Sequence, residues 1–239
     1  MRYRNFVLLL AVLFLIACSS KLSTDTASSV IESAFKLSDN DELKILGTTE
    51  ETKGTVIVKF QLNDKTMSVK LRKYDQGWQL EEIQNELGSW IPATTIINAL
   101  DEASKVKTAR AEIGIISSAI ADYVTDKATP PSASGSYDET SQLYKSLCPF
   151  YVKKLPIKDP WGNNYLVYCG TAVDGQYGIS GGASDDFLVV SHGKGGERET
   201  WTYNPSAPDS GLYTDKDDTK DLVNLNGSFI RGPRAGVWD

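Results

Sequence analysis

Few residues of this 239-residue chain have the types and spacing that catalysis requires. Residues 178–182, GISGG, fit the Gly-x-Ser-x-Gly pattern of a serine nucleophile, with Ser180 as the reactive group. Such a nucleophile needs a sharp turn between a strand and a helix, whereas residues 183–186, ASDD, are followed by a strand-like apolar run. His192, the one histidine, lies only 12 residues after Ser180, too near to supply the base of a triad. We therefore expect a glycine-rich loop here and a protein that is not an enzyme.

The N-terminus has the charge and hydropathy profile of an export signal. Two arginines precede an apolar run over residues 6–16, and Ala17 precedes Cys18. A basic start, a short apolar segment and a small residue before the cleavage point are typical of a signal peptide. The run is shorter than the roughly 20 residues of a membrane-spanning helix. We predict a signal peptide over residues 1–17, followed by a lipidated tether over residues 18–24.

Residues 15–18, LIAC, resemble the lipobox of bacterial lipoproteins. The resemblance implies diacylglycerol on the Cys18 thiol, cleavage after Ala17, and acylation of the new N-terminus with a chain such as palmitate. More than one chain is needed for stable anchoring, because each buried CH₂ contributes only about 0.8 kcal/mol. Ser19 replaces the aspartate that retains such proteins at the inner membrane, which favours the outer membrane of a Gram-negative envelope. The alternative is an ordinary signal peptide with a chance cysteine.

Charge and cysteine content narrow the class of protein further. Removing the signal leaves 222 residues (239 − 17) and, without its two arginines, a net charge of −8 (−6 − 2). We expect no nucleic-acid partner, because affinity for nucleic acid depends on neutralising phosphates. Cys148 and Cys169 remain as an even pair in an oxidising compartment, and we predict a disulfide between them. The alternative is two separate buried thiols.

Residues 25–92 are predicted to form a small α+β domain. An amphipathic helix places Val30, Ile31, Ala34 and Phe35 on one face, after which the hydrophobic period becomes two. The alternating apolar residues are Val56, Val58, Phe60, Leu62, Met67, Val69 and Leu71. This alternation, with polar turns, predicts an antiparallel meander. The pattern is similar to small NTF2-like or cystatin-like modules, which allows a small-ligand-binding cup, but an apolar interior favours a packing domain.

Residues 93–239 are predicted to form a second domain that begins with a long helix over residues 95–125. One continuous apolar stripe supports this helix. Its members are Val106, Ala109, Ile113, Ile116, Ile120 and Tyr123. A polar loop over residues 132–140 and a Gly-, Pro- and Asp-rich region with short strands follow. The strands are expected at residues 165–169, 187–190, 222–225 and 228–230.

Two segments of the second domain carry a family resemblance. Residues 151–165, YVKKLPIKDPWGNNY, contain Asp-Pro-Trp-Gly-Asn after Leu-Pro, and residues 220–229 contain the hairpin signal Asn226-Gly227. Pro160 restricts φ, and the glycine and asparagine that follow suit a tight turn. From about residue 103 to residue 233 the chain resembles the C-terminal domain of the type II secretion major pseudopilin. The resemblance implies a pilin-like α+β fold, in which a long helix packs on a short antiparallel sheet with long loops.

The chain departs from that family ahead of the long helix. A working pseudopilin begins with a basic leader, a Gly-Phe cleavage junction and an apolar helix that packs inside the fibre. Here residues 90–93, WIPA, precede the long helix, so we expect that the domain cannot enter a pseudopilus as an ordinary subunit. Lipid on Cys18 would anchor it instead. The expected function is that of a non-enzymatic, membrane-anchored periplasmic lipoprotein with a structural or interaction domain, possible partners being secretion or pilus components.

The resemblance also raises the question of calcium. The family's loop pattern Ser-x-Gly-x-Asp-Gly corresponds to residues 191–196, SHGKGG, in which Gly195 occupies the acidic position. Clustered loop carboxylates are compatible with the six to eight oxygen ligands that Ca²⁺ takes. An insertion over residues 197–220 supplies further aspartates, and Asp221 matches the family's aspartate before the final strand, so Asp218 and Asp221 are the candidate ligands. The alternative is a solvated acidic loop.

Overall fold

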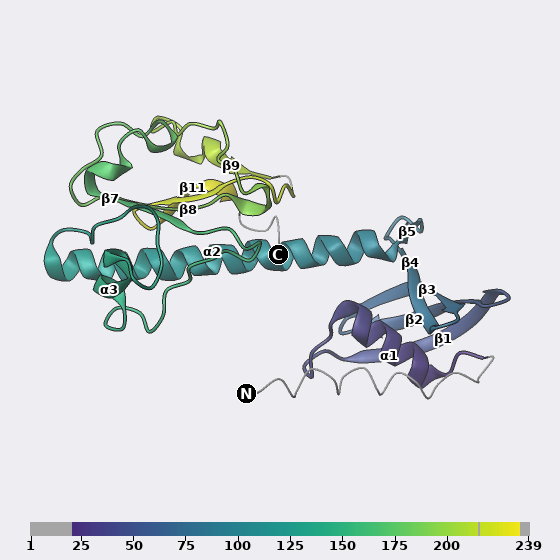
Figure 1. Cartoon of the computed structure of the whole chain (residues 1–239). Coiled ribbons are helices and arrows are strands. Elements are labelled where there is room, and N and C mark those ends of the chain that lie inside the picture. Colours follow the sequence, from purple (N-terminus) through teal and green to yellow (C-terminus); the bar gives the residue numbers. More distant parts are fainter. Residues whose placement is uncertain (1–20, 215, 235–239) are drawn as a thin grey trace. The chain divides into compact units, whose positions relative to one another are not determined.

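The computed structural model describes residues 21–214 and 216–234 (Figure 1). The chain divides into two compact units, the first ending at Leu100 and the second beginning at Asp101. The domain limits 25–92 and 93–239 stay a prediction. Cys18 and the signal peptide expected before it lie outside the described residues. In the part of the chain that is described, no helix has the length and apolar character that a membrane crossing requires.

Helix α1, Thr24–Phe35, is the first element of the first unit. The Ser23 hydroxyl oxygen caps its N-terminus by accepting a hydrogen bond from the Thr26 N–H at 3.1 Å. Ala27 and Ile31 are fully buried against the sheet that follows. The amphipathic helix confirms the sequence prediction.

Five strands follow α1 and form one antiparallel meander in chain order. They are β1 (Leu43–Thr52), β2 (Thr55–Leu62), β3 (Lys65–Tyr74), β4 (Gly77–Gln84) and β5 (Trp90–Pro92). Alternate apolar residues of β2 and β3 form the core with α1, as predicted. Strand β1 has ten residues. From Gly47 onward its residues are exposed and show no alternation, although they pair with β2 to the end of the strand.

Helix α2, Ala93–Lys127, matches the long helix predicted over residues 95–125. The predicted stripe is buried from Val106 to Ile120, and Tyr123 packs against the same cluster at its edge. The helix ends before Ala128, which has a left-handed φ of 60°. A left-handed residue at this position is a common way to end a helix.

The second unit contains a six-stranded sheet with the order β6-β7-β8-β10-β11-β9. The strands are β6 (Ser134–Ser136), β7 (Leu166–Cys169), β8 (Phe187–Ser191), β9 (Leu212–Tyr213), β10 (Leu222–Leu225) and β11 (Ser228–Pro233). All neighbouring strands are antiparallel except β9 and β11, which are parallel. The α+β, pilin-like class is confirmed, and the sheet is mixed instead of purely antiparallel.

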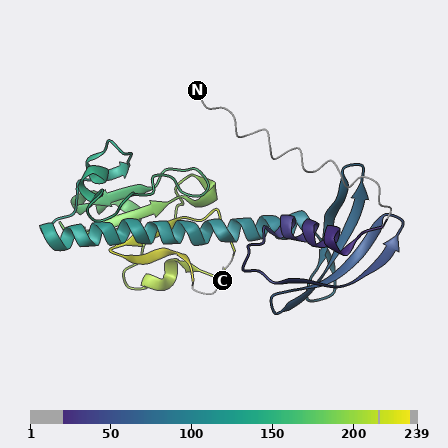
Figure 2. The same cartoon turned by 90° about the horizontal axis from the view of Figure 1, so that it is seen from below.

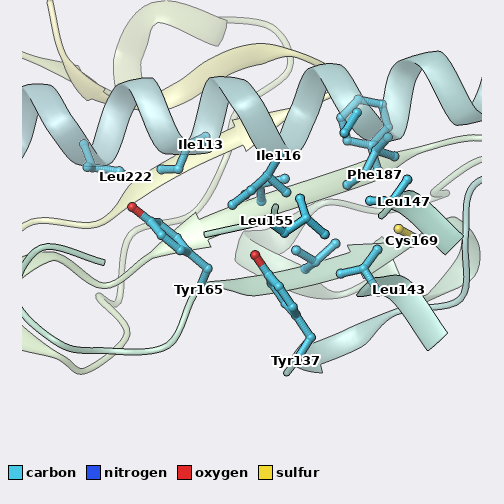
Figure 3. Packing of buried hydrophobic residues seen from close by; sticks show 14 of the residues in the cluster. Ile113, Ile116, Tyr137, Leu143, Leu147, Leu155, Tyr165, Cys169, Phe187 and Leu222 are labelled. Carbon is cyan, nitrogen blue, oxygen red and sulfur yellow. The ribbon is translucent and has the colours of Figure 1, made fainter. Parts of the chain in front are cut away.

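Both faces of this sheet are covered (Figures 1 and 2). Helix α2 packs on one face, where Ile113 and Ile116 meet Leu155 and Tyr165 (Figure 3). The long loops between β7 and β10 pack on the other face and form a second apolar cluster. Strand β8 is therefore buried at every position. This explains why its sequence is an unbroken apolar run and does not alternate.

Several short elements were not predicted. Strand β6 lies inside the segment expected to be a polar loop, and helix α3, Gln142–Leu147, follows it with Ser141 as N-cap. Four short 3-10 helices lie in the long loops: η1 (Gly170–Val173), η2 (Gln176–Gly178), η3 (Gly193–Gly195) and η4 (Pro208–Gly211). The hairpin predicted at Asn226-Gly227 is confirmed, because both residues have positive φ, 50° and 85°.

Candidate functional site

The Gly-x-Ser-x-Gly segment lacks the geometry of a serine nucleophile. Ser180 is exposed and follows η2, and the next helix or strand is β8. All residues between Ser180 and β8 are described, and they form no helix, which a nucleophile elbow requires. The segment is the glycine-rich loop that the sequence predicted.

Three loops of the second unit meet beside α2: residues 158–164, 191–196 and 217–221, together called the loop junction. Asp159, only 4% exposed, lies at its centre. Its Oδ1 accepts hydrogen bonds from the N–H groups of Trp161 at 3.1 Å and Asn163 at 2.9 Å. Its Oδ2 accepts one from the Ser191 hydroxyl at 2.7 Å. Three donors thus compensate the burial of this carboxylate.

Gly193 allows two of these loops to approach closely. It has a φ of +57°, and a Cβ there would lie 2.8 Å from the Asp218 carbonyl oxygen and 2.7 Å from that of Lys220. The Lys194 N–H donates to the Asp218 carbonyl at 2.9 Å, and the Asn163 side-chain amide donates to the Gly193 carbonyl at 2.7 Å. Any other residue at position 193 would push the loops apart and strain the backbone.

Glu102 joins the loop junction to α2. Its Oε2 accepts a hydrogen bond from the Trp161 indole N–H at 2.6 Å, and its Oε1 lies 3.3 Å from Lys194 Nζ. Lys194 Nζ also lies 3.2 Å from Asp218 Oδ2. Burial acts to raise the pKa of Glu102, but hydrogen bonds, foremost those from Trp161 and Lys105, hold it below its ordinary value. One lysine ammonium therefore links a carboxylate of α2 to a carboxylate of the last loop.

Asp218 and Asp221, the predicted calcium ligands, interact with different groups of the protein. Asp218 pairs with Lys194, whereas the fully buried Asp221 accepts hydrogen bonds from the Tyr177 hydroxyl and the Glu199 N–H. Among the residues described, no three His, Cys, Asp or Glu side chains form a group that could hold a metal. Calcium takes six to eight oxygens, and the only buried side-chain oxygen without a hydrogen-bond partner in the described chain is Asp221 Oδ1. The two candidate ligands thus have separate structural partners.

Removing calcium is therefore expected to leave the thermal unfolding midpoint unchanged. The positive charge beside Asp218 comes from Lys194, so no metal ion is required there. A cation bound only by the folded state would raise stability in proportion to RT ln(1 + [L]/Kd). The measurement is differential scanning fluorimetry in EDTA and in excess CaCl₂, with Lys194→Met as the variant that lacks the ammonium and Lys194→Arg as the charge-conserving control. A calcium-dependent rise in the wild-type midpoint would contradict this prediction.

A second buried network surrounds Arg231, which is 9% exposed. Its Nε donates to Glu199 Oε2 at 2.9 Å, its Nη2 to Glu199 Oε1 at 2.7 Å, and its Nη1 to the Gly211 carbonyl at 3.1 Å. Glu199 Oε2 also accepts a hydrogen bond from the Asp221 N–H at 3.0 Å. The network therefore joins the loop that contains Glu199 to the start of β10 and to β11.

Asp221 predicts a pH dependence of stability. Burial raises the pKa of its carboxyl above the ordinary 3.8. The folded state then holds this proton more tightly than the unfolded chain does. The stability that the bound proton contributes is therefore present below about pH 3.9, the ordinary pKa of an aspartate, and is lost as pH rises through the folded pKa. In denaturant unfolding across pH, we expect wild-type stability to fall with rising pH relative to Asp221→Asn.

Asp217 supplies a control of opposite sign for that experiment. Hydrogen bonds from the Thr219 hydroxyl and N–H lower the pKa of Asp217. Its contribution is therefore present above the ordinary pKa and is lost as pH falls through the folded one. Wild-type stability should rise with pH relative to Asp217→Asn. A difference between wild type and Asp221→Asn that stays constant across pH would refute the role given to Asp221.

Cys148 and Cys169 are both free thiols in the structure. Cys169 is 8% exposed in the core cluster under α2 (Figure 3). Cys148 packs against the same cluster. Burial raises the pKa of the Cys169 thiol to about 12, which keeps it protonated and slow to react. The structure has the alternative arrangement of two separate thiols, and the disulfide stays a prediction.

The first unit has a charged groove of about 440 Å³ on its sheet. Lys70 lies between Val69 and Leu71, which face the core, so its side chain is on the opposite face. Its Nζ lies 2.9 Å from Glu82 and 3.2 Å from Glu51. Because these charges pair with one another and the core toward α1 is apolar, the first unit fits a packing domain better than a ligand-binding cup.

Comparison with known proteins gives a family match over residues 95–202 of this chain. No curated protein and no solved structure matches the chain. The family match ends before the last three strands, but it includes Asp159, Trp161 and the loop at residues 191–196. Residues 95–202 match the model of the family described as Type II secretion system (T2SS), protein G, so this segment is similar to the pseudopilin that the Asp-Pro-Trp-Gly-Asn motif predicted.

Proposed function

We propose that this protein is a non-enzymatic lipoprotein of the bacterial cell envelope that presents a pseudopilin-like domain to type II secretion components. The family match over residues 95–202 carries the proposal. The loop junction supports it, because the Asp-Pro-Trp-Gly-Asn turn is tied to α2 through the Trp161–Glu102 hydrogen bond. Such a buried polar network suits a rigid surface that a partner recognises.

The proposed anchor is lipid on Cys18. Its support is the order of a basic start, an apolar run over residues 6–16 and the sequence LIAC. A pseudopilin-like domain held in this way would stay at the membrane surface and would not enter a fibre as a subunit. The Ser19 that follows the cysteine favours the outer membrane, with the globular part in the periplasm.

The anchor is tested by metabolic labelling of the full chain with a palmitate analogue, followed by membrane fractionation. Wild type should carry the label on its acyl chains. It should also sediment with membranes, because more than one acyl chain gives stable attachment. Cys18→Ser should lose both properties, whereas Cys148→Ser, the matched control, should keep both. An unlabelled wild-type protein would refute the lipid anchor and leave the pseudopilin-like domain unaffected.

The secretion role is tested by cross-linking in intact cells and purification of the lipidated protein. We expect cross-links to proteins of the type II secretion apparatus that are lost when the loop junction is disrupted by Trp161→Ala. Because Trp161 donates its indole N–H to Glu102 and contributes to packing, a melting curve must show that the variant is folded. Recovery of the folded wild-type protein without any secretion component would refute this role.

A further inference from the structure

Phe150 is the most exposed large apolar residue in the described chain, with 91% of its surface accessible. Its position is nevertheless well defined by its neighbours. The Tyr151 N–H donates to the Leu147 carbonyl at 2.9 Å, and Leu147 is fully buried in the core cluster. A single exposed apolar residue is common, so the surroundings of the ring decide whether it has a role.

Phe150 forms one wall of a groove of about 360 Å³ at the end of α2. The other lining residues are Asp122, Thr125, Asp126 and Tyr151. The Tyr151 hydroxyl donates to Asp126 Oδ2 at 3.0 Å, and its ring meets that of Tyr123 edge-on with the centroids 5.4 Å apart. The groove therefore has two aromatic walls, Phe150 and Tyr151, and a rim of carboxylates. Contacts with α2 fix the position of Tyr151.

The electrostatics of this groove are unfavourable without a ligand. Asp122 and Asp126 are exposed and four residues apart on α2, a spacing at which like charges repel. Asp126 also lies in the last turn of the helix, which ends at Lys127, where the helix dipole disfavours an anion. Neither carboxylate forms an ion pair with a lysine or arginine within the described residues. A cation in the groove would relieve both effects.

We infer that the groove binds an arginine side chain of a protein partner. A guanidinium is planar and can stack on the Phe150 ring while its N–H groups donate to Asp122 and Asp126. A lysine ammonium offers the charge but not the stacking plane. Two carboxylates and a hydroxyl supply fewer oxygens than the six to eight that Ca²⁺ takes. An exposed aromatic ring surrounded by a polar rim is also the usual form of an interface anchor.

This surface goes beyond the proposed function and does not depend on it, because cation binding requires only the groove itself. The probe is the peptide Ac-Gly-Arg-Gly-Arg-Gly-NH₂, and its control is the same peptide with citrulline, a neutral isostere of arginine. Titration into the isotope-labelled, detergent-solubilised full chain is followed through the backbone amide shifts of Thr125 and Tyr151. We expect the arginine peptide to shift these amides and the citrulline peptide to leave them unchanged.

Variants separate the ring from the carboxylates. Phe150→Ala should weaken binding about two- to fivefold, the effect of one exposed cation–π contact. The double variant Asp122→Asn with Asp126→Asn should weaken it by at least about threefold. Leu87→Ala, a change at an equally exposed apolar residue of the first unit, should have no effect. Because Phe150 is exposed, its variant should keep the wild-type melting midpoint.

Three results would overturn the inference. The first is equal binding of the arginine and citrulline peptides. The second is wild-type affinity in the double Asp variant. The third is a concentration-dependent dimer in sedimentation that Phe150→Ala abolishes, because the groove would then bind a second copy of this chain in place of a different partner.

Discussion

Arg231→Met is expected to lower the free energy of unfolding of the second unit by about 3 kcal/mol, because it leaves the Glu199 carboxylate without its cation. The guanidinium makes two hydrogen bonds to Glu199 and one to the Gly211 carbonyl. Because 22% of the Glu199 side chain is exposed to solvent, the expected loss of stability lies at the lower end of the range for buried pairs. The loop that contains Glu199 should become mobile first, since this pair joins it to β11.

The measurement is denaturant unfolding combined with native-state hydrogen exchange. Two units need not unfold in one transition, so exchange of the β10 and β11 amides reports the second unit and that of β2 and β3 serves as an internal control. Arg72→Met is the matched variant, because Arg72 pairs with Glu81 at 3.1 Å while 54% of its side chain is exposed. It should change stability little. A similarly small effect of Arg231→Met would contradict the structural role of the buried pair.

Several of the elements that the sequence predicted have one buried face. The β2 and β3 residues alternate because one face packs on α1, and the α2 stripe has helical spacing because one face packs on the second sheet. Strand β8 was predicted for a different reason. It is buried on both faces, which leaves a short run of apolar residues bounded by loops.

The missed elements depend on contacts that local sequence does not encode. Strand β9 has two residues and exists because it pairs in parallel with the end of β11, about 20 residues later. Strand β6 is the sequence Ser-Gly-Ser, which has low strand propensity, yet it pairs with β7. Neither has a hydrophobic period that could be recognised in the chain. Tertiary pairing decides their conformation.

The candidate site was predicted only in part, because its contacts also join residues that are distant in the sequence. The Asp-Pro-Trp-Gly-Asn turn was recognised from its own residues, but its partners Glu102 and Ser191 lie 57 residues before and 32 residues after Asp159. Nothing in the local sequence indicates those contacts. Asp218 and Asp221 were grouped because the insertion supplies clustered aspartates and Asp221 matches the family's aspartate before the final strand. In the structure one pairs with a lysine, whereas the other is buried beside Tyr177.

Asp159→Ala is expected to destabilise the second unit by about 3 kcal/mol, because it leaves the N–H groups of Trp161 and Asn163 and the Ser191 hydroxyl without their acceptor in a buried site. All three hydrogen bonds are at most 3.1 Å long. Their loss should also release the Trp161 indole from Glu102. Hydrogen exchange of the Trp161 and Asn163 amides, together with the free energy of unfolding, measures both effects.

Asp159→Asn separates the carboxylate's charge from its geometry. The amide oxygen can still accept from the two backbone N–H groups, and the amide nitrogen can donate to the Ser191 hydroxyl, so the cost should be nearer about 1 kcal/mol, that of one typical net hydrogen bond. Asp185→Ala, an exposed aspartate of the same unit, controls for the change in net charge. Equal losses for Asp159→Ala and Asp185→Ala would show that the hydrogen bonds of Asp159 do not hold the loop junction. Slow exchange at Asn163 in the alanine variant would show the same, because only an intact turn protects that amide.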